Sequence, residues 1–164
     1  MSNELSSKNH VRQLLADHGL YAKKHFGQNF LTDSHVLSKI VDGADLSEGD
    51  TVIEVGPGLG VLTTELAGRA SRVIAVEIDQ DLAQILTATM PDNVTVIRED
   101  ILKLDVRHAV GASPLASNNI KVVANLPYYI TSAVIFGLLE QGLPIKTMVV
   151  MVQKEVADRF LAKP

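Results

Sequence analysis

The chain has 164 residues, of which 46% are hydrophobic, which is enough to bury the core of one domain. It has no cysteine, which excludes a disulfide framework and a cysteine-ligated metal site and agrees with a reducing compartment, so we expect a cytoplasmic protein. The net charge of −4 argues mildly against a nucleic-acid partner, and no apolar stretch approaches the roughly 20 residues that a membrane span needs.

In chain order, Asp33 precedes apolar residues at helical spacing, and this pattern predicts a helix that ends near Gly43. A second helix is predicted after Asp79. Between and beyond them lie continuous apolar, β-branched runs at 51–55, 72–76, 94–97, 120–124 and 147–152, which are typical of buried parallel strands. The alternation predicts an α/β fold with a doubly wound, mostly parallel sheet.

The last residues of the chain follow a predicted helix without any closing strand. We therefore expect a sheet that is cut short before its closing antiparallel strands. An apolar strand without a neighbour can pair with another chain, so self-association through the edge at 147–152 is predicted. Residues 111–119 are small and polar and predict a loop.

A glycine-rich turn follows the first strand. Gly56, Gly58 and Gly60 have the spacing G-x-G-x-G, Pro57 stiffens the turn, and Glu54 lies two residues before it. A ligand can approach the backbone closely at such a turn. The spacing differs from the dinucleotide pattern G-x-G-x-x-G, which favours S-adenosylmethionine over NAD as the cofactor.

Carboxylates end the next two strands. Glu77 is placed to accept hydrogen bonds from both hydroxyls of a ribose, and Asp100 is placed to accept one from an adenine amino group. With their neighbours Ile78 and Ile101, they are predicted to bind the cofactor. A carboxylate at a strand end is more often only solvated, but acids after successive strands strengthen the functional interpretation.

The fourth strand leads into Asn125, Leu126, Pro127 and Tyr128, which we predict to be the catalytic residues. The Asn125 side-chain oxygen and the Leu126 carbonyl can accept the two hydrogens of an adenine amino group, so that its lone pair is held toward the methyl donor. Pro127 stiffens the turn, and Tyr128 offers a ring on which the base can stack. Asn125 is also predicted to contact the cofactor. Positioning alone serves this transfer, so no metal is expected.

Together these residues resemble the ribosomal RNA adenine dimethyltransferase family. The segment 24–31, KHFGQNFL, is similar to the entry motif of that family and implicates Gln28, Asn29 and Leu31 in binding the methionine end of the cofactor. The segment from Met151 to Ala157, with Arg159, is similar to a strand-to-helix passage of the family, in which Lys154 and Arg159 are candidate phosphate contacts.

The resemblance implies an N-terminal helical arm at 1–45 and a Rossmann-like core at 46–164 that binds S-adenosylmethionine and releases S-adenosylhomocysteine. It implies N6,N6-dimethylation of two adjacent adenosines near the 3′ end of 16S ribosomal RNA in the immature 30S subunit. Family members continue into a helical RNA-binding domain, so we expect this chain to bind the cofactor but to methylate RNA poorly.

Three other interpretations stay open at this point. A resistance-type enzyme would methylate large-subunit ribosomal RNA. A non-catalytic ribosome assembly factor would bind the small subunit without using the cofactor in a reaction. An NAD-dependent oxidoreductase would also use Glu77, but it has no need of the residues at 125–128.

Overall fold

A computed structural model of the chain describes residues 16–17, 19, 33–111 and 119–162. Five parallel strands form one sheet in the order β3-β2-β1-β4-β5, which confirms the expected α/β class. The strands are β1 (Thr51–Val55), β2 (Arg72–Glu77), β3 (Val94–Arg98), β4 (Ile120–Asn125) and β5 (Ile145–Met151). The helices are α3 (Ser34–Gly43), α4 (Val61–Ala67), α5 (Gln80–Thr89), α6 (Val106–Val110), α7 (Thr131–Glu140) and α8 (Lys154–Leu161).

Aspartate caps begin two of the helices where the sequence predicts them. One carboxylate oxygen of Asp33 accepts hydrogen bonds from the backbone N–H groups of His35 and Val36. Asp79 caps α5 in the same way through the N–H groups of Asp81 and Leu82. These bonds satisfy N–H groups that have no partner within the helix, which fixes where each helix begins.

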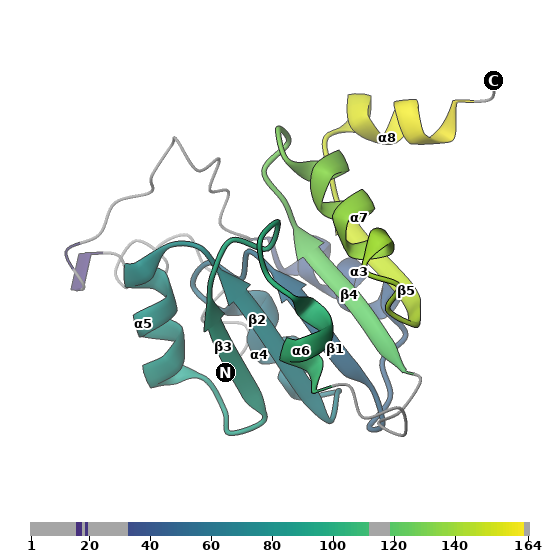
Figure 1. Ribbon diagram of the computed structural model, residues 1–164. Helices are drawn as coiled ribbons and strands as arrows, with labels where there is room; N and C mark the ends of the chain where they lie inside the picture. The colour runs from purple at the N-terminus through teal and green to yellow at the C-terminus, as the bar shows by residue number, and fades with distance from the viewer. Residues whose placement is uncertain (1–15, 18, 20–32, 112–118, 163–164) are drawn as a thin grey trace.

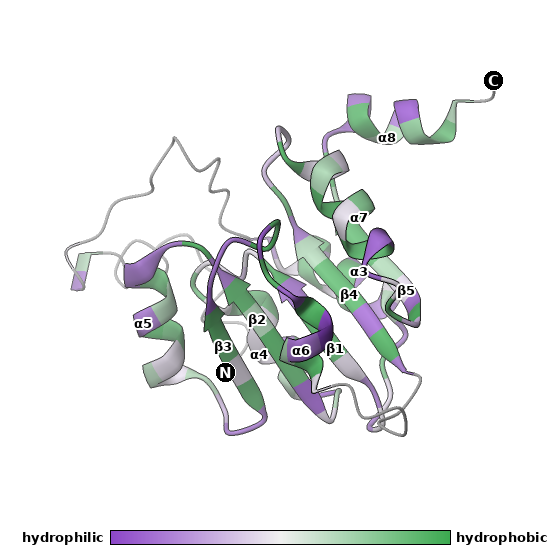
Figure 2. Ribbon diagram, viewed as in Figure 1, coloured by the Kyte–Doolittle hydropathy of each residue, from purple (hydrophilic) through white to green (hydrophobic). Residues whose placement is uncertain are grey.

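Two apolar layers hold the sheet between helices. Ile53, Val55 and the inward residues of α6 and α7 form one buried cluster. Val52 and the inward residues of α3 and α4 form the other. Figure 1 shows α6 and α7 in front of the sheet and α4 behind it. The strands are largely hydrophobic along their length (Figure 2), as expected for a sheet covered on both faces.

Helix α3 belongs to this packing. Its residues Leu37, Ile40 and Val41 lie in the same buried cluster as Val52 of β1 and Val123 of β4. The sequence predicts an N-terminal arm at residues 1–45. The packing shows that the last helix of that range lies on the sheet, and the boundary at 45 stays a prediction.

The strand order reverses between β1 and β4. The chain runs from β1 outward to β2 and β3, and then returns to the other side of β1 to form β4 and β5. In doubly wound sheets a ligand binds at the carboxyl ends of the two strands that flank this switch point. The fold therefore directs attention to the turns that follow Val55 and Asn125.

Strand β5 is the edge strand of the described sheet, as the sequence predicts, and it pairs with β4 alone among the described strands. Its side chains are mostly half-buried. The self-association expected from this edge stays a prediction. Helix α8 follows β5 and has no buried residue, so it adds little to the core.

Candidate active site

The glycine turn lies against the end of β4. Gly56 has a positive φ of 71°, and its N–H donates to the Val76 carbonyl at 3.0 Å. A methyl group built on Gly56 would lie 3.5 Å from the Asn125 carbonyl oxygen. The two motifs that the sequence singles out, 69 positions apart by residue number, therefore meet at the switch point of the sheet.

The glycine turn is also tied to β2. The Gly58 N–H donates to Glu77 Oε2 at 3.1 Å, and the Asp79 N–H donates to Glu77 Oε1 at 2.9 Å. Glu77 is only 4% exposed. Burial raises the pKa of this carboxyl group, while the two backbone N–H donors oppose the rise. Each oxygen still has lone pairs left for a hydroxyl donor, which fits the predicted role in binding a ribose.

Gly60 has a different role in the fold from Gly56. It has a φ of 83° and begins α4. A methyl group at this position would lie 2.7 Å from Met90 Cε and 2.8 Å from Leu86 Cδ2. The positive φ favours glycine here, and the side-chain ends of Met90 and Leu86 would have to shift to admit a methyl group. A cofactor contact by Gly60 stays a prediction.

Glu54 is fully buried at the end of β1. Side chains alternate along a strand, so Glu54 and Glu77 lie on the same face of the sheet as Val52. The pKa of Glu54 is raised to about 8, chiefly by burial; the Thr63 hydroxyl opposes this rise, and the nearby Glu77 carboxylate adds to it. The net result is a carboxyl group that is mostly protonated at neutral pH.

Thr63 is the residue that the sequence analysis missed here. It lies in α4, is fully buried, and faces Glu54. Glu54 Oε2 and Thr63 Oγ1 have no hydrogen-bond partner of good geometry among the described residues. A buried polar atom without a partner is costly unless a ligand or water completes it. No spacing rule relates these two residues, because α4 brings them together only in the fold.

The turn after β3 is built around Asp100. Its Oδ1 accepts a hydrogen bond from the Leu102 N–H at 3.0 Å, and its carbonyl accepts from Lys103 and Leu104. Ile101 is buried with the cluster of β1 and β4, whereas Ile78, at the end of β2, is 49% exposed. Ile78 therefore offers apolar surface for a ligand, and the Ile101 side chain serves the core.

The turn after β4 contains one residue that is packed in the core and one whose aromatic ring is exposed. Asn125 is half-buried, and Leu126 is packed in the core at 7% exposed. The Pro127 carbonyl accepts hydrogen bonds from the Ile130 N–H and the Thr131 hydroxyl, which joins the turn to α7. Tyr128 is 59% exposed, so its ring is accessible to a base.

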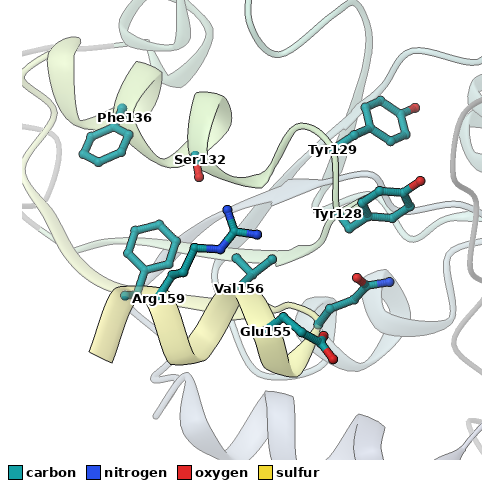
Figure 3. A pocket seen from close by; sticks show the side chains of 9 residues that line it. Tyr128, Tyr129, Ser132, Phe136, Glu155, Val156 and Arg159 are labelled. Carbon is teal, nitrogen blue, oxygen red and sulfur yellow. The ribbon is translucent and has the colours of Figure 1, made fainter. Parts of the chain in front are cut away.

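The predicted entry-motif residues Gln28, Asn29 and Leu31 lie outside the described residues, and their roles stay predictions. Figure 3 shows a hollow beside Tyr128, between α7 and α8, that no part of the sequence analysis predicts. Among the two candidate phosphate contacts, Arg159 lines this hollow, whereas Lys154 forms an ion pair with Asp158 at 2.8 Å.

Comparison with known proteins decides the family. The model of the ribosomal RNA adenine dimethylase family matches residues 19–164. The chain belongs to this family. It is 49% identical over 166 residues to a ribosomal RNA small subunit methyltransferase A of Bacillus licheniformis, covering 100% of this chain and 57% of that protein. It is 52% identical over 156 residues to the protein of the same name from Streptococcus pneumoniae, covering 94% and 54% of the two chains.

Solved structures agree with this assignment. A dimethyladenosine transferase from Plasmodium falciparum is similar with a TM-score of 0.65 and 31% identity, over 80% of this chain and 46% of that one. The 23S rRNA methyltransferase ErmE is similar with a TM-score of 0.63 and 34% identity, over 79% and 50%. The chain thus spans about half the length of these relatives.

In the described part of the chain, no helix has the length and apolar character needed to cross a membrane. Within the same residues, no group of three or more histidine, cysteine or acidic side chains is arranged to hold a metal ion.

Proposed function

We propose that this chain forms the cofactor-binding and catalytic part of an enzyme that transfers methyl groups from S-adenosylmethionine to the N6 atom of adenosines in ribosomal RNA. The observation that carries the proposal is the meeting of Gly56 with the Asn125 carbonyl at the switch point. A cofactor bound over Gly56 lies next to the residues that hold the target base. Membership of the ribosomal RNA adenine dimethylase family supports the same reaction.

The residues present fit such a cofactor. Gly56 leaves its backbone open, and Glu77 presents a carboxylate at the edge of the sheet. Glu54 Oε2 and Thr63 Oγ1, which have no hydrogen-bond partner within the described part of the chain, add polar groups close to the turn that a ligand or water could complete. When bound, S-adenosylmethionine supplies an electrophilic methyl group and a net positive charge, which a carboxylate at Glu77 favours.

The catalytic work of the chain is positioning. The Asn125 side-chain oxygen and the Leu126 carbonyl accept the two hydrogens of the adenine amino group, which orients the nitrogen lone pair. The Leu126 side chain is anchored in the core and Pro127 is bonded to α7, so these acceptors are held on rigid supports. The Tyr128 ring provides a stacking surface for the base.

The finer proposal concerns the substrate. Both relatives named above are called small subunit methyltransferases, which supports ribosomal RNA of the small subunit as the substrate. The resemblance described in the sequence extends the proposal to two adjacent adenosines near the 3′ end of 16S ribosomal RNA, within the immature 30S subunit. ErmE is a 23S rRNA methyltransferase at lower identity, which keeps a large-subunit substrate as the alternative.

Calorimetric titration tests the cofactor part of the proposal. The chain should bind S-adenosylmethionine and not NAD. Glu77→Gln should weaken binding by about 10- to 100-fold, because a hydrogen bond to a charged group contributes about 1.5–3 kcal/mol. Asp92→Asn, an exposed acid in the turn before β3, is the matched control and should leave the affinity unchanged. Binding of NAD in place of S-adenosylmethionine would overturn the proposal.

A second experiment separates the enzyme from a non-catalytic assembly factor. Asn125→Ala should abolish methyl transfer to unmethylated small subunits by the full-length protein, while ribosome binding is retained. An assembly factor that does not depend on the reaction would support subunit maturation equally well with asparagine or alanine at position 125.

A further inference from the structure

The hollow between α7 and α8 has a volume of about 430 Å³, which lies within the size range of ligand pockets. Four aromatic rings line it, and all are about half exposed: Tyr128 at 59%, Tyr129 at 53%, Phe136 at 55% and Phe160 at 48%. Tyr128 and Tyr129 are edge to face, with ring centroids 5.7 Å apart. Exposed rings gathered around one hollow are a feature that requires an explanation.

Polar groups converge on the same space. The Arg159 side chain extends from α8 toward Ser132 of α7 (Figure 3). The structure records no hydrogen bond or ion pair between Arg159 and another described residue, in contrast to the pairing of Lys154 with Asp158. Gln153 and Glu155 complete the polar part of the wall. The hollow therefore offers rings for stacking, a guanidinium group with no ion-pair partner among the described residues, and groups that can bond to a base edge.

We propose that this hollow is a subsite for a nucleotide that neighbours the target adenosine in single-stranded RNA. The neighbouring base stacks on the rings of Phe136 and Phe160, and the Arg159 guanidinium binds the adjoining phosphate. Single-stranded RNA is commonly bound through such a combination of aromatic faces and arginine. This inference rests on the proposed function, because it takes the adenosine to be held at Asn125.

Continuity with the target-base residues supports an RNA occupant. Tyr128 belongs both to the turn that is proposed to hold the target base and to the wall of the hollow. A strand whose adenosine stacks on Tyr128 thus continues directly into the hollow.

The distribution of apolar side chains argues against a protein partner. Leu139 and Leu161, which are 56% and 79% exposed, lie outside the lining. The wall consists of rings and polar groups, with Val156 as its aliphatic member. A helix-binding groove would be expected to use exposed leucines of this kind, whereas planar bases require flat faces.

Fluorescence anisotropy with a fluorescein-labelled single-stranded hexaribonucleotide that contains two adjacent adenosines tests the subsite. Phe136→Ala and Phe160→Ala should each weaken binding about tenfold, as is typical for the loss of one base-stacking ring. Arg159→Gln should weaken binding and reduce its salt dependence. Phe136→Tyr keeps the ring and should keep the affinity. Leu139→Ala, on the same helix but outside the lining, is the matched control.

The outcomes distinguish this inference from the proposed function. Calorimetry with S-adenosylmethionine on each variant should give the wild-type affinity, because none of these residues lies at the glycine turn. The subsite is refuted if the wild type binds the cofactor but the ring variants bind the hexanucleotide as tightly as the wild type. It is also refuted if the wild type does not bind the hexanucleotide. Loss of self-association in the ring variants, with RNA binding intact, would assign the hollow to a second copy and also refute it. Failure to bind the cofactor would count against the proposed function itself.

Discussion

The buried carboxyl group of Glu54 makes the stability of this chain depend on pH in a specific direction. Its pKa rises from 4.5 to about 8 on folding, chiefly because burial disfavours the charged form. Between these values the folded state holds a proton that the unfolded state has lost. The free energy of unfolding therefore falls as pH rises, with the full contribution present below pH 4.5 and the decline ending near pH 8.

The change Glu54→Gln removes this titration while nearly keeping the shape of the side chain. For each pH unit between the two pKa values, the free energy of unfolding of the wild type falls by about 1.4 kcal/mol relative to that of the variant. The limit is about 5 kcal/mol over the whole interval. Between pH 5.5 and 7.5, the difference in unfolding free energy should move by about 2.5 kcal/mol in favour of the variant. Any constant cost of the amide cancels, because only the change with pH is compared.

Urea unfolding followed by circular dichroism at pH 5.5, 6.5 and 7.5 measures this difference. Glu48→Gln, at an exposed turn, is the matched control and should give a difference that does not vary with pH. A flat difference for Glu54→Gln as well would show that the Glu54 carboxyl ionises near its ordinary pKa. The reasoning from its burial would then be wrong.

Three further predictions concern the site and the sheet. S-adenosylmethionine should bind more tightly as pH rises from 6 to 8, by at most about tenfold per unit, because a bound cation favours ionised Glu54; calorimetry should find this trend absent in Glu54→Gln. Gly60→Ala should lower the free energy of unfolding by about 1–3 kcal/mol through its positive φ and its contacts with α5, whereas Gly137→Ala, in the open middle of α7, should raise it by up to about 1 kcal/mol in the same urea assay. Lys121→Met should lower the free energy of unfolding by about 3–5 kcal/mol, because it leaves the buried Asp50 carboxylate without the ammonium group that lies 3.0 Å away. Adding Asp50→Asn should restore part of that loss. An exposed ion pair would show neither effect.

The apolar pattern of the sequence predicts the five strands but not their order in the sheet. Continuous apolar runs predicted β1 to β5, and the aspartates at 33 and 79 predicted the starts of α3 and α5, because these signals are local. The residues that follow each strand indicated which strand ends carry the cofactor and target residues, and the resemblance agreed with them. The contact between Gly56 and Asn125 depends on β4 pairing with β1, which is a long-range choice.

Some residues of the candidate site have a local sequence signal, and others are recognised only in the folded structure. The glycine spacing, the acids at the ends of β2 and β3, and the sequence Asn125 to Tyr128 were all visible in the chain, since each lies where a strand gives way to a turn. Thr63 was not, because it lies in the buried first turn of α4 with no local signal of chemistry. Only the packing of α4 over β1 shows that its hydroxyl is buried with no hydrogen-bond partner among the residues that the structure describes.

The sequence by itself determined the fold class, the family motifs and the helix starts, because short-range periodicity and capping are properties of neighbouring residues. Only the tertiary structure decided that Gly60 lies against the side chains of Leu86 and Met90, that Glu54 lies out of water beside Glu77, and that aromatic rings from α7 and α8 surround one hollow. Burial, pKa and concavity all depend on which distant segments cover a side chain. The sequence does not show which segments cover a side chain, because this depends on how the sheet and its helices are assembled.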